Sequence, residues 1–488
     1  MKMDRRSVLK LGALVGAAAV LPVERLAGAY AGHDAEHEAA TLAVPRFAVP
    51  LTVPRVLRPS SRDLFTDYYD ITMREARQVI VPGTKTPIWG YDGIFPGPTI
   101  RAWTGRKVVI RQRNALPEDV AVHLHGGNVP SSSDGIPGQE IKPGQTRVYT
   151  YPNHQPAATL WYHDHVHHQE SLHTYLGLTG LYIISDVAEQ KLHLPRGRYD
   201  VPLVIQDRFF NPDGSFRPPD PDAGEFFGDT MLVNGKPLPY FEVEQRAYRF
   251  RILNGSSLDA TLSLHLDSGA SMAVIGTDGG LLPAPVPASE IPVFPSERVE
   301  VVIDFAKYPL GTQIVLQGSI LGIPVEVMRF DVTRRAHGHD HDRLPSTLVP
   351  VSRLREADAK VRRDFVLNLD RATGTMRING KEFDPDRVDI SPRLGDTEIW
   401  TVRNGEQADL PIPHVFHTHL VRFQILDRDG APPAPREAGW KDSVAIMPGQ
   451  QVRLIMKFGD FTGRYLYHCH LLGHADAGMM AQMEVVRH

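Results

Sequence analysis

Alternating hydrophobic and polar residues recur along this chain in short runs, a pattern that predicts half-buried β-strands. Three of these runs have the same layout and end on asparagine: KVVIRQRN at Asn114, YRFRILN at Asn254 and EIWTVRN at Asn404. The asparagines are 140 and 150 residues apart. Similar runs at such long intervals indicate repeated copies of one β domain.

A turn follows each of these runs at a comparable distance. KPGQ, FPSE and MPGQ place Pro143, Pro295 and Pro448 at intervals of 152 and 153 residues, and each turn precedes another alternating run. The 41 glycines and 40 prolines suit many short strands joined by turns, as in β-sandwiches. With 488 residues, 42% of them hydrophobic, each of three domains can have its own core. The sequence therefore predicts an all-β chain of three consecutive domains.

A motif near the C-terminus indicates copper. His468-Cys469-His470, which contains the only cysteine of the chain, is followed by His474 and Met479. A thiolate, an imidazole from His474 and another from upstream, with a weak thioether at longer range, form the trigonal ligand set of a blue-copper electron-transfer centre. A single methionine is more often core packing than a ligand. The spacing of Met479, ten residues after Cys469, favours the axial ligand.

The histidines beside Cys469 need a different role. Side chains of an extended strand alternate between its two faces, so Tyr465, Tyr467 and Cys469 share one face. His468 and His470 share the other face. We therefore expect one strand to serve two metal sites back to back.

Histidines at a spacing of two recur in three further β-like segments, AVHLHGG, LWYHDH and HVFHTH. These pairs are His123 and His125, His163 and His165, and His417 and His419, with His414 three residues before the last pair. Together with the pair around Cys469 they supply eight imidazoles, enough for three further copper ions at two or three nitrogens each. Nitrogen ligands with open positions suit copper that must bind oxygen. One such pair alone is usually coincidence, but four pairs beside a Cys/His/Met array indicate a metal site.

The first and third repeats carry all four pairs, and the middle repeat has none. In both, a histidine follows the turn proline by twenty residues, so that YHDH at 162–165 superimposes on YHCH at 467–470. Asp164 thus stands in the first domain where the thiolate stands in the third. Four imidazoles from each of these domains predict a metal cluster at their interface, with the middle domain as a spacer.

These motifs resemble those of the three-domain multicopper oxidases, of the bacterial laccase, spore-coat laccase and bilirubin oxidase type. The resemblance covers residues 46–488 and includes softer matches such as FPGPTI at 95–100, DTMLVNGKPLP at 229–239 and GWKDSV at 439–444. It implies three consecutive cupredoxin-like Greek-key β-sandwich domains. The implied divisions are 46–188, 189–335 and 351–488 for the domains, and 336–350 for a His-rich linker.

The resemblance also implies four copper ions per chain: one type 1, one type 2 and two type 3. It assigns the type 1 copper to His414, Cys469, His474 and Met479. It assigns the type 2 copper to His123 and His417, and the type 3 pair to His125, His163, His165, His419, His468 and His470. Electrons then pass from the type 1 centre along the Cys469 backbone, through His468 and His470, to the cluster where oxygen becomes water.

Forming water from oxygen also requires protons at a buried cluster, and a nearby carboxylate is the expected relay. Asp134, in SSSDGIPG, matches an acidic residue that the resembled family places near the type 2 copper. An Asp-Gly turn would by itself also explain this residue. Many members of the family carry a glutamate directly after the last type 1 histidine, whereas this chain has Ala475 followed by Asp476. We therefore expect Asp134 to carry more of the proton traffic.

Three functions fit these motifs. The first is a laccase-like enzyme that couples one-electron oxidation of phenols, aryl amines or related donors to four-electron reduction of O₂. The second is a metallo-oxidase of cuprous ion; such enzymes often carry a methionine-rich insert, and here the twelve methionines are dispersed. The third is a non-catalytic copper-binding relative, which the intact histidine and cysteine positions disfavour. O₂ and a small-molecule donor are thus the expected partners.

Charge and the N-terminus bear on partners and location. A net charge of −4 without a basic stripe argues against a nucleic-acid partner. Residues 1–31 combine a basic region, a short apolar run and small residues around 27–29, which predicts a cleavable export signal. Arg5-Arg6 resembles a twin-arginine signal, with an ordinary secretory signal as the alternative. We expect an exported, periplasmic or extracellular monomer with no integral membrane segment after signal removal.

The segment 334–350 holds His337, His339 and His341 among charges and prolines. This composition predicts a solvated linker, with accessory metal binding as the alternative.

Overall fold

The computed structural model describes residues 42–220, 225–336, 344–406 and 413–487. The predicted export signal and the three histidines of the predicted linker lie outside these residues.

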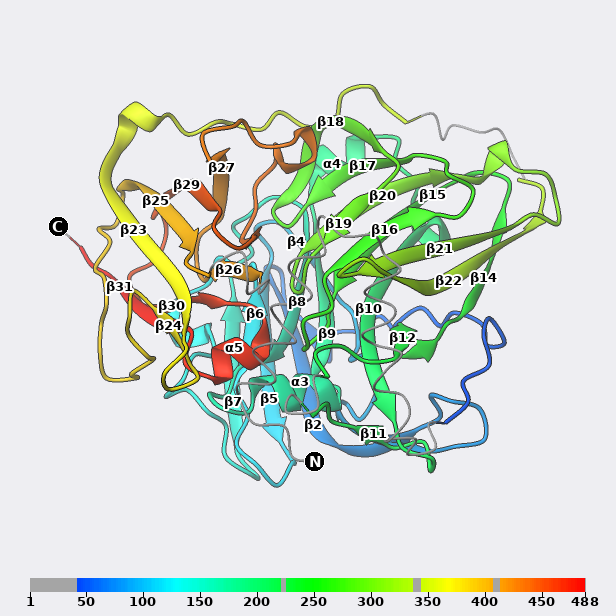
Figure 1. Ribbon diagram of the computed structural model, residues 1–488, viewed down its shortest axis with the longest axis horizontal. Helices are drawn as coiled ribbons and strands as arrows, with labels where there is room; N and C mark the ends of the chain where they lie inside the picture. Colours follow the sequence, from blue (N-terminus) through cyan, green and yellow to red (C-terminus); the bar gives the residue numbers. More distant parts are fainter. Residues whose placement is uncertain (1–41, 221–224, 337–343, 407–412, 488) are drawn as a thin grey trace.

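Strands dominate the described chain, and its helices are short (Figure 1). The α-helices are α3 Glu170–Leu176, α4 Val187–Lys191 and α5 Leu472–Asp476. The 3-10 helices are η2 Ser131–Ser133, η3 Gly197–Tyr199, η5 Phe305–Lys307, η6 Glu356–Asp358 and η7 Pro435–Glu437. Among the described residues, every helix is too short or too polar to cross a membrane.

The described strands form six sheets, two in each third of the chain. We call the strands within 61–185 the first unit, those within 200–334 the middle unit and those within 359–485 the third unit. In Figure 1 the third unit, yellow to red, lies at the left and the middle unit, green, at the right. The predicted all-β architecture is confirmed, while the predicted domain boundaries stay predictions.

The first unit contains two sheets. One comprises β1 Ser61–Arg62, β2 Thr66–Gln78, β5 Lys107–Asn114 and β7 Thr146–Tyr151 in this order, with β3 Thr86–Tyr91 paired to β2. The other comprises β4 Ile100–Trp103, β9 Thr179–Ser185, β8 Ala158–Asp164 and β6 Val122–His125. Aliphatic and tyrosine side chains of both sheets form the core of this unit.

The middle unit has a larger sheet and a smaller one. The larger comprises β13 Lys236–Pro237, β12 Thr230–Val233, β10 Asp200–Phe210, β15 Ala247–Asn254, β20 Arg298–Asp304, β17 Met272–Thr277 and β18 Gly280–Ala288, with β11 Phe216–Arg217 on β10. The smaller comprises β14 Tyr240–Glu244, β22 Ile323–Arg334, β21 Gln313–Ile320, β16 Leu262–Leu266 and β19 Ile291–Val293. A second core lies between them.

The third unit repeats this two-sheet arrangement. One sheet comprises β24 Thr375–Ile378, β23 Ala359–Asp370, β25 Thr397–Asn404, β29 Gln451–Lys457 and β27 Phe423–Arg428. The other comprises β28 Ser443–Ile446, β26 His414–Thr418, β30 Gly463–Cys469 and β31 Met480–Val485. Its core includes the fully buried Trp400 and Cys469.

The repeat seen in the sequence is a repeat of topology. In each unit the strand that ends on asparagine pairs parallel with an earlier strand: β5 with β2, β15 with β10 and β25 with β23. It then pairs antiparallel with the strand after the proline turn: β7, β20 or β29.

The three asparagines serve as the same clamp. Each side-chain amide donates to the carbonyl two residues before the turn proline: Asn114 to Ile141, Asn254 to Val293 and Asn404 to Ile446. Each side-chain oxygen accepts the backbone N–H two residues further on. A buried amide with all these bonds joins the end of one strand to the turn before the next.

Replacing Asn254 with alanine removes a 2.7 Å bond to the Ala260 carbonyl, a 2.8 Å bond to the Val293 carbonyl and a 3.1 Å bond from the Ser256 N–H. Because these buried groups lose their partners, we expect the free energy of unfolding of the copper-free protein to fall by about 2–3 kcal/mol. Denaturant unfolding measures this change. Asn368→Ala, on β23 and half-buried, is the control for residue type; equal losses in both variants would contradict the clamp.

Candidate metal centre

Four strands bring the histidine pairs together. β6 and β8 are neighbours in the first unit, and His123 lies directly opposite His163 across this pair. β26 and β30 are neighbours in the third unit, and His417 lies directly opposite His468. Because cross-strand partners project from the same face, each unit presents four imidazoles on one face of a sheet.

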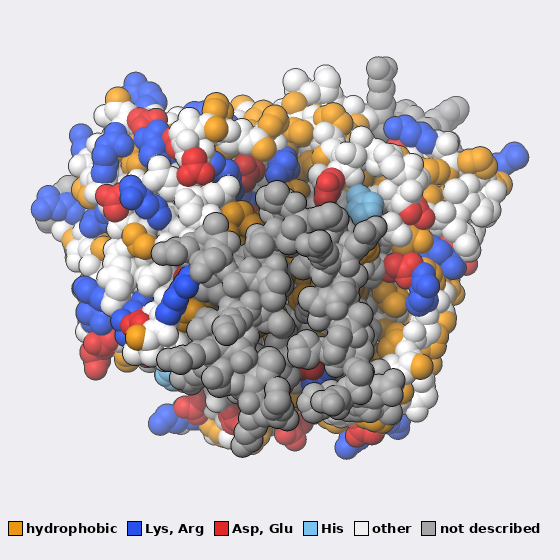
Figure 2. Space-filling model, in the orientation of Figure 1, with side chains coloured by type: hydrophobic (Ala, Val, Ile, Leu, Met, Phe, Trp, Pro, Cys, Tyr) orange, Lys and Arg blue, Asp and Glu red, His pale blue; other side chains and the backbone are white. Residues whose placement is uncertain are grey.

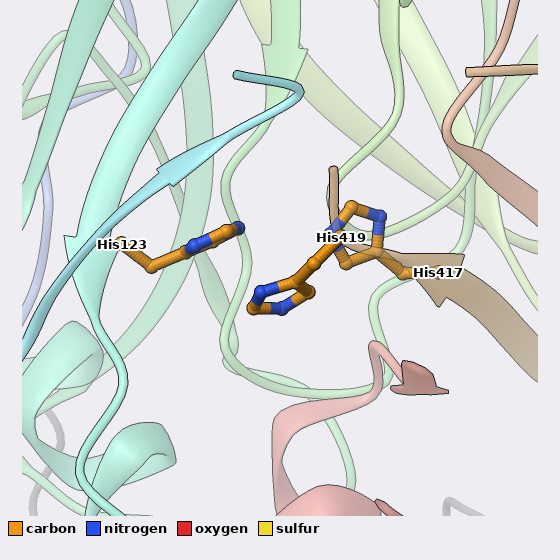
Figure 3. Close-up of side chains that lie close together, drawn as sticks. All are labelled: His123, His417 and His419. Atoms are coloured by element: carbon orange, nitrogen blue, oxygen red, sulfur yellow. The ribbon is translucent and has the colours of Figure 1, made fainter. Parts of the chain in front are cut away.

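The two faces meet, and the eight imidazoles form one cluster. His123 stacks on His419 and His125 on His417, each with ring centroids 3.8 Å apart. Figure 3 shows His123 on its strand at the left, facing His417 and His419 from the strand at the right. Three groups have ring nitrogens within 4.8 Å of one another: His123, His417 and His419; His125, His163 and His470; and His165, His419 and His468.

The chemistry of this cluster fits metal ions. All eight rings are 0–1% exposed. One ring nitrogen has no hydrogen-bond partner on each of His123, His125, His163, His165 and His417, and on His470 both ring nitrogens have none. Burial lowers the pKa of His123 to about 3 and that of His468 to about 4, so these rings are neutral near pH 7. Neutral imidazole is the form that binds metal, and a metal would satisfy nitrogens whose isolation otherwise costs stability.

A second group of side chains, His414, Cys469 and His474, lies on the face of β30 opposite to the imidazole cluster. Cys469 Sγ is 3.6 Å from His474 Nδ1 and 3.8 Å from His414 Nδ1. Burial raises the pKa of the Cys469 thiol to about 12, so a thiolate here requires a positively charged partner such as a metal ion. Met479 is fully buried in the same core, and its carbonyl accepts the Cys469 N–H at 3.1 Å. Its role as axial ligand stays a prediction.

The two groups share covalent structure. His468 and His470 flank Cys469, and His468 Nδ1 donates to the Cys469 carbonyl at 3.0 Å. The structure thus places the Cys469 group and the imidazole cluster on opposite faces of one strand, and the two metal sites expected there stay a prediction.

Asp134 lies against the imidazole cluster. Its Oδ2 accepts from His419 Nδ1 at 2.7 Å, and its backbone carbonyl accepts from His123 Nδ1 at 2.8 Å. Its other carboxyl oxygen is buried without a hydrogen bond, and burial raises the pKa of Asp134 well above its usual value. Asp134 also closes the η2 turn through its own N–H to Ser131. The turn and the contact with the histidines are thus compatible.

Four carboxyls near the two groups were not expected from the sequence, and one of them, that of the buried Glu406, lies 3.7 Å from His414 Nε2. Asp442 accepts from His125 Nε2 at 3.0 Å, and its carbonyl accepts from His417 Nδ1 at 2.8 Å. Glu170 is buried 3.5 Å from His165 Nδ1. Asp259 lies 3.9 Å from His474 Nε2.

Only one of them carried a sequence signal. Asp442 belongs to GWKDSV, one of the weaker motifs in which the sequence resembles the multicopper oxidases. Glu170 begins α3 and is held by its backbone N–H to Asp476 Oδ1 at 3.1 Å, a contact between the first and third units. Asp259 comes from the middle unit. Tertiary contacts alone bring these two residues to the site.

Comparisons with known proteins agree with this geometry. Residues 72–189 and 354–488 each match a family model described as multicopper oxidase. A laccase of Bacillus stratosphericus is 37% identical over 91% of this chain and 99% of its own length. The bilirubin oxidase of Albifimbria verrucaria is 32% identical over 90% of this chain and 81% of its own length.

Solved structures show the same fold. The crystal structure of a laccase from Pediococcus acidilactici superimposes with a TM-score of 0.84 at 33% identity, over 91% of this chain and 95% of that one. The predicted cupredoxin-like sandwiches and the four-copper complement of this family are thereby confirmed. The chain belongs to the multicopper oxidase family.

Proposed function

We propose that this multicopper oxidase is laccase-like: it oxidises small organic donors one electron at a time and reduces O₂ to water. The observation that carries the proposal is β30, which presents Cys469 on one face and His468 and His470 beside it toward the imidazole cluster. Copper held by these residues supplies the one-electron and oxygen chemistry.

The ligand roles follow from the groups described above. His414, Cys469, His474 and Met479 would hold the type 1 ion; His123 and His417 the type 2 ion; and His125, His163, His165, His419, His468 and His470 the type 3 pair. Geometry supports all of these except Met479, whose support is its burial beside Cys469.

The donor site is proposed at His474. This histidine is 8% exposed, whereas His414, Cys469 and Met479 are fully buried, so a donor meets the type 1 group at the His474 ring. The Asp259 carboxyl lies beside that ring with 25% of its side chain exposed, and burial raises its pKa to about 7. A carboxyl that can accept a proton suits donors such as phenols and aryl amines, which release one on oxidation.

Oxidation of cuprous ion is the second candidate. A multicopper oxidase of Campylobacter jejuni that is described as a metallo-oxidase superimposes with a TM-score of 0.80 at 26% identity. The dispersed methionines of this chain disfavour that function.

Export is proposed from the N-terminal sequence alone. Arg5-Arg6 and the apolar run after them support the twin-arginine route to a periplasmic or extracellular location. Charge supports the absence of a nucleic-acid partner: on the face in Figure 2, basic and acidic side chains are interspersed over the described surface. We also propose that the protein is a monomer.

Cys469→Ser should abolish the blue thiolate-to-copper absorption and the oxidation of organic donors, because serine cannot supply a thiolate. The imidazole cluster should keep its copper, about three of the roughly four ions of the wild type. Visible spectroscopy and metal analysis measure both effects. A variant that is still blue would contradict the type 1 assignment.

Organic donors should be oxidised with a higher kcat/KM than cuprous ion. Oxygen consumption by the copper-loaded protein, with a phenol, bilirubin and cuprous ion compared in parallel, measures the ranking. A higher kcat/KM with cuprous ion would reverse the order of the two candidate functions.

Asp259→Asn should lower kcat/KM for the phenol by about 10- to 100-fold. It should leave an electron donor without an exchangeable proton, such as ferrocyanide, unaffected.

Asp134→Asn should preserve the hydrogen bond to His419 but remove the exchangeable carboxyl proton. We therefore expect wild-type copper content and colour, with oxidation of the reduced protein by O₂ slowed by about 100-fold. Single-turnover stopped-flow measurements isolate this step. Asp207→Asn is the matched control, a buried aspartate that accepts from Ser256 and Gly228 in the middle unit. Wild-type reoxidation in Asp134→Asn would leave Asp134 as a turn residue only.

A further inference from the structure

Arg298, the first residue of β20, joins all three units at one point. It is 1% exposed, and all its N–H groups have acceptors. Nε donates to the Thr159 carbonyl on β8 at 3.0 Å, and Nη1 to the Ser296 carbonyl at 2.9 Å. Nη2 donates to the Asp278 carbonyl at 3.3 Å. Nη1 and Nη2 also hold the two carboxyl oxygens of Asp442 in the third unit.

This two-pronged contact fixes the plane of the Asp442 carboxylate, because each oxygen accepts from a different nitrogen of a rigid guanidinium. Oδ1 of Asp442 is the oxygen that also accepts from His125 Nε2 at 3.0 Å. A carboxylate only accepts hydrogen bonds, so Nε2 of His125 carries the ring proton. The free lone pair of His125 is then on Nδ1, the nitrogen that has no hydrogen-bond partner.

The surroundings of this contact leave little room for rearrangement. Gly126, directly after His125, has a positive φ of 80°, and a Cβ there would lie 2.6 Å from Asp442 Oδ2 and 2.8 Å from Arg298 Nη2. Ser443 Oγ lies 3.2 Å from His125 Nε2 and accepts a hydrogen bond from Ser296 Oγ at 2.9 Å. The adjacent Lys441 pairs with Asp278 at 2.9 Å and with Glu297 at 3.2 Å. Residues of the middle unit thus contact Asp442 and both of its neighbours in sequence, Lys441 and Ser443.

We infer that Arg298 is a positioning residue of the trinuclear copper cluster: it holds Asp442 so that His125 keeps its Nε2–H form and offers Nδ1 toward His163 and His470. The middle unit, which the sequence predicts to be a spacer, thereby sets the geometry of a ligand in the first unit. Partners beyond the direct ligands fix the tautomer and orientation of metal-binding histidines in this way. The inference rests on the proposed ligand roles.

Lysine at position 298 tests the inference, because it keeps the charge but cannot hold two oxygens as a planar fork. Arg251→Lys is the matched control. Arg251 is equally buried on β15 and hydrogen-bonds Asp200, Glu300, Glu189 and Thr159 rather than Asp442. Both variants lose a buried guanidinium fork in the middle unit, and only one of them loses the contact that orients His125.

In Arg298→Lys we expect the blue type 1 absorption to persist while the affinity of the cluster for copper falls by roughly 10- to 100-fold. The type 2 EPR signal should change with it. In the copper-free protein, ¹⁵N NMR of the imidazoles should show His125 as the Nε2–H form in wild type and in Arg251→Lys, and a mixture in Arg298→Lys.

Three results would overturn the inference. One is wild-type copper affinity, EPR signal and His125 form in Arg298→Lys. The second is an equal loss in Arg251→Lys, which would indicate general destabilisation. The third is an Arg298→Lys chain that yields no soluble blue protein, which would assign Arg298 to folding. A wild-type protein that binds no copper at the imidazole cluster would instead contradict the proposed function.

Discussion

The two-residue alternation of side chains along β30 is the constraint on which the rest of the site depends. It places the thiol of Cys469 in the core of the third unit and the flanking imidazoles of His468 and His470 on the opposite face. That opposite face can complete a cluster only by meeting the imidazoles of β6 and β8. The association of the first and third units is therefore a requirement of the metal chemistry as well as of packing.

Burial creates the main electrostatic problem of this interface. Ten histidines of the two groups are 0–8% exposed, and desolvation lowers the pKa of each of them. Neutral rings need defined acceptors for the nitrogen that does not bind metal. Backbone carbonyls serve His163, His417 and His468, and carboxyls serve His125 and His419. The protein thus selects one form of each of these rings before any metal is present.

The sequence predicts the repeated parts of this architecture well. The asparagine-ended runs, the proline turns and the histidine pairs depend on local pattern, and the structure has strands and a histidine cluster at these positions. Asp134 could be proposed because it matches an acidic residue that the resembled family places near the type 2 copper. Arg298, Asp259 and Glu170 could not, because each acts on a residue in another unit, and no periodicity encodes contacts across sheets. The middle unit contributes no histidine to the cluster, so its part in orienting His125 was also hidden.

The depth of the histidine cluster has a consequence for how the metal stays in place. With every ring of the cluster 0–1% exposed, an ion can enter or leave only when part of the interface between the first and third units opens. Each unit has its own core and its own asparagine clamp, so each half of the imidazole cluster is held by the sheet of its own unit. Exchange of the metal is therefore governed by the frequency of opening and not by affinity alone. Once filled, the cluster is kinetically trapped, and a chelator in solution competes with a slow structural fluctuation.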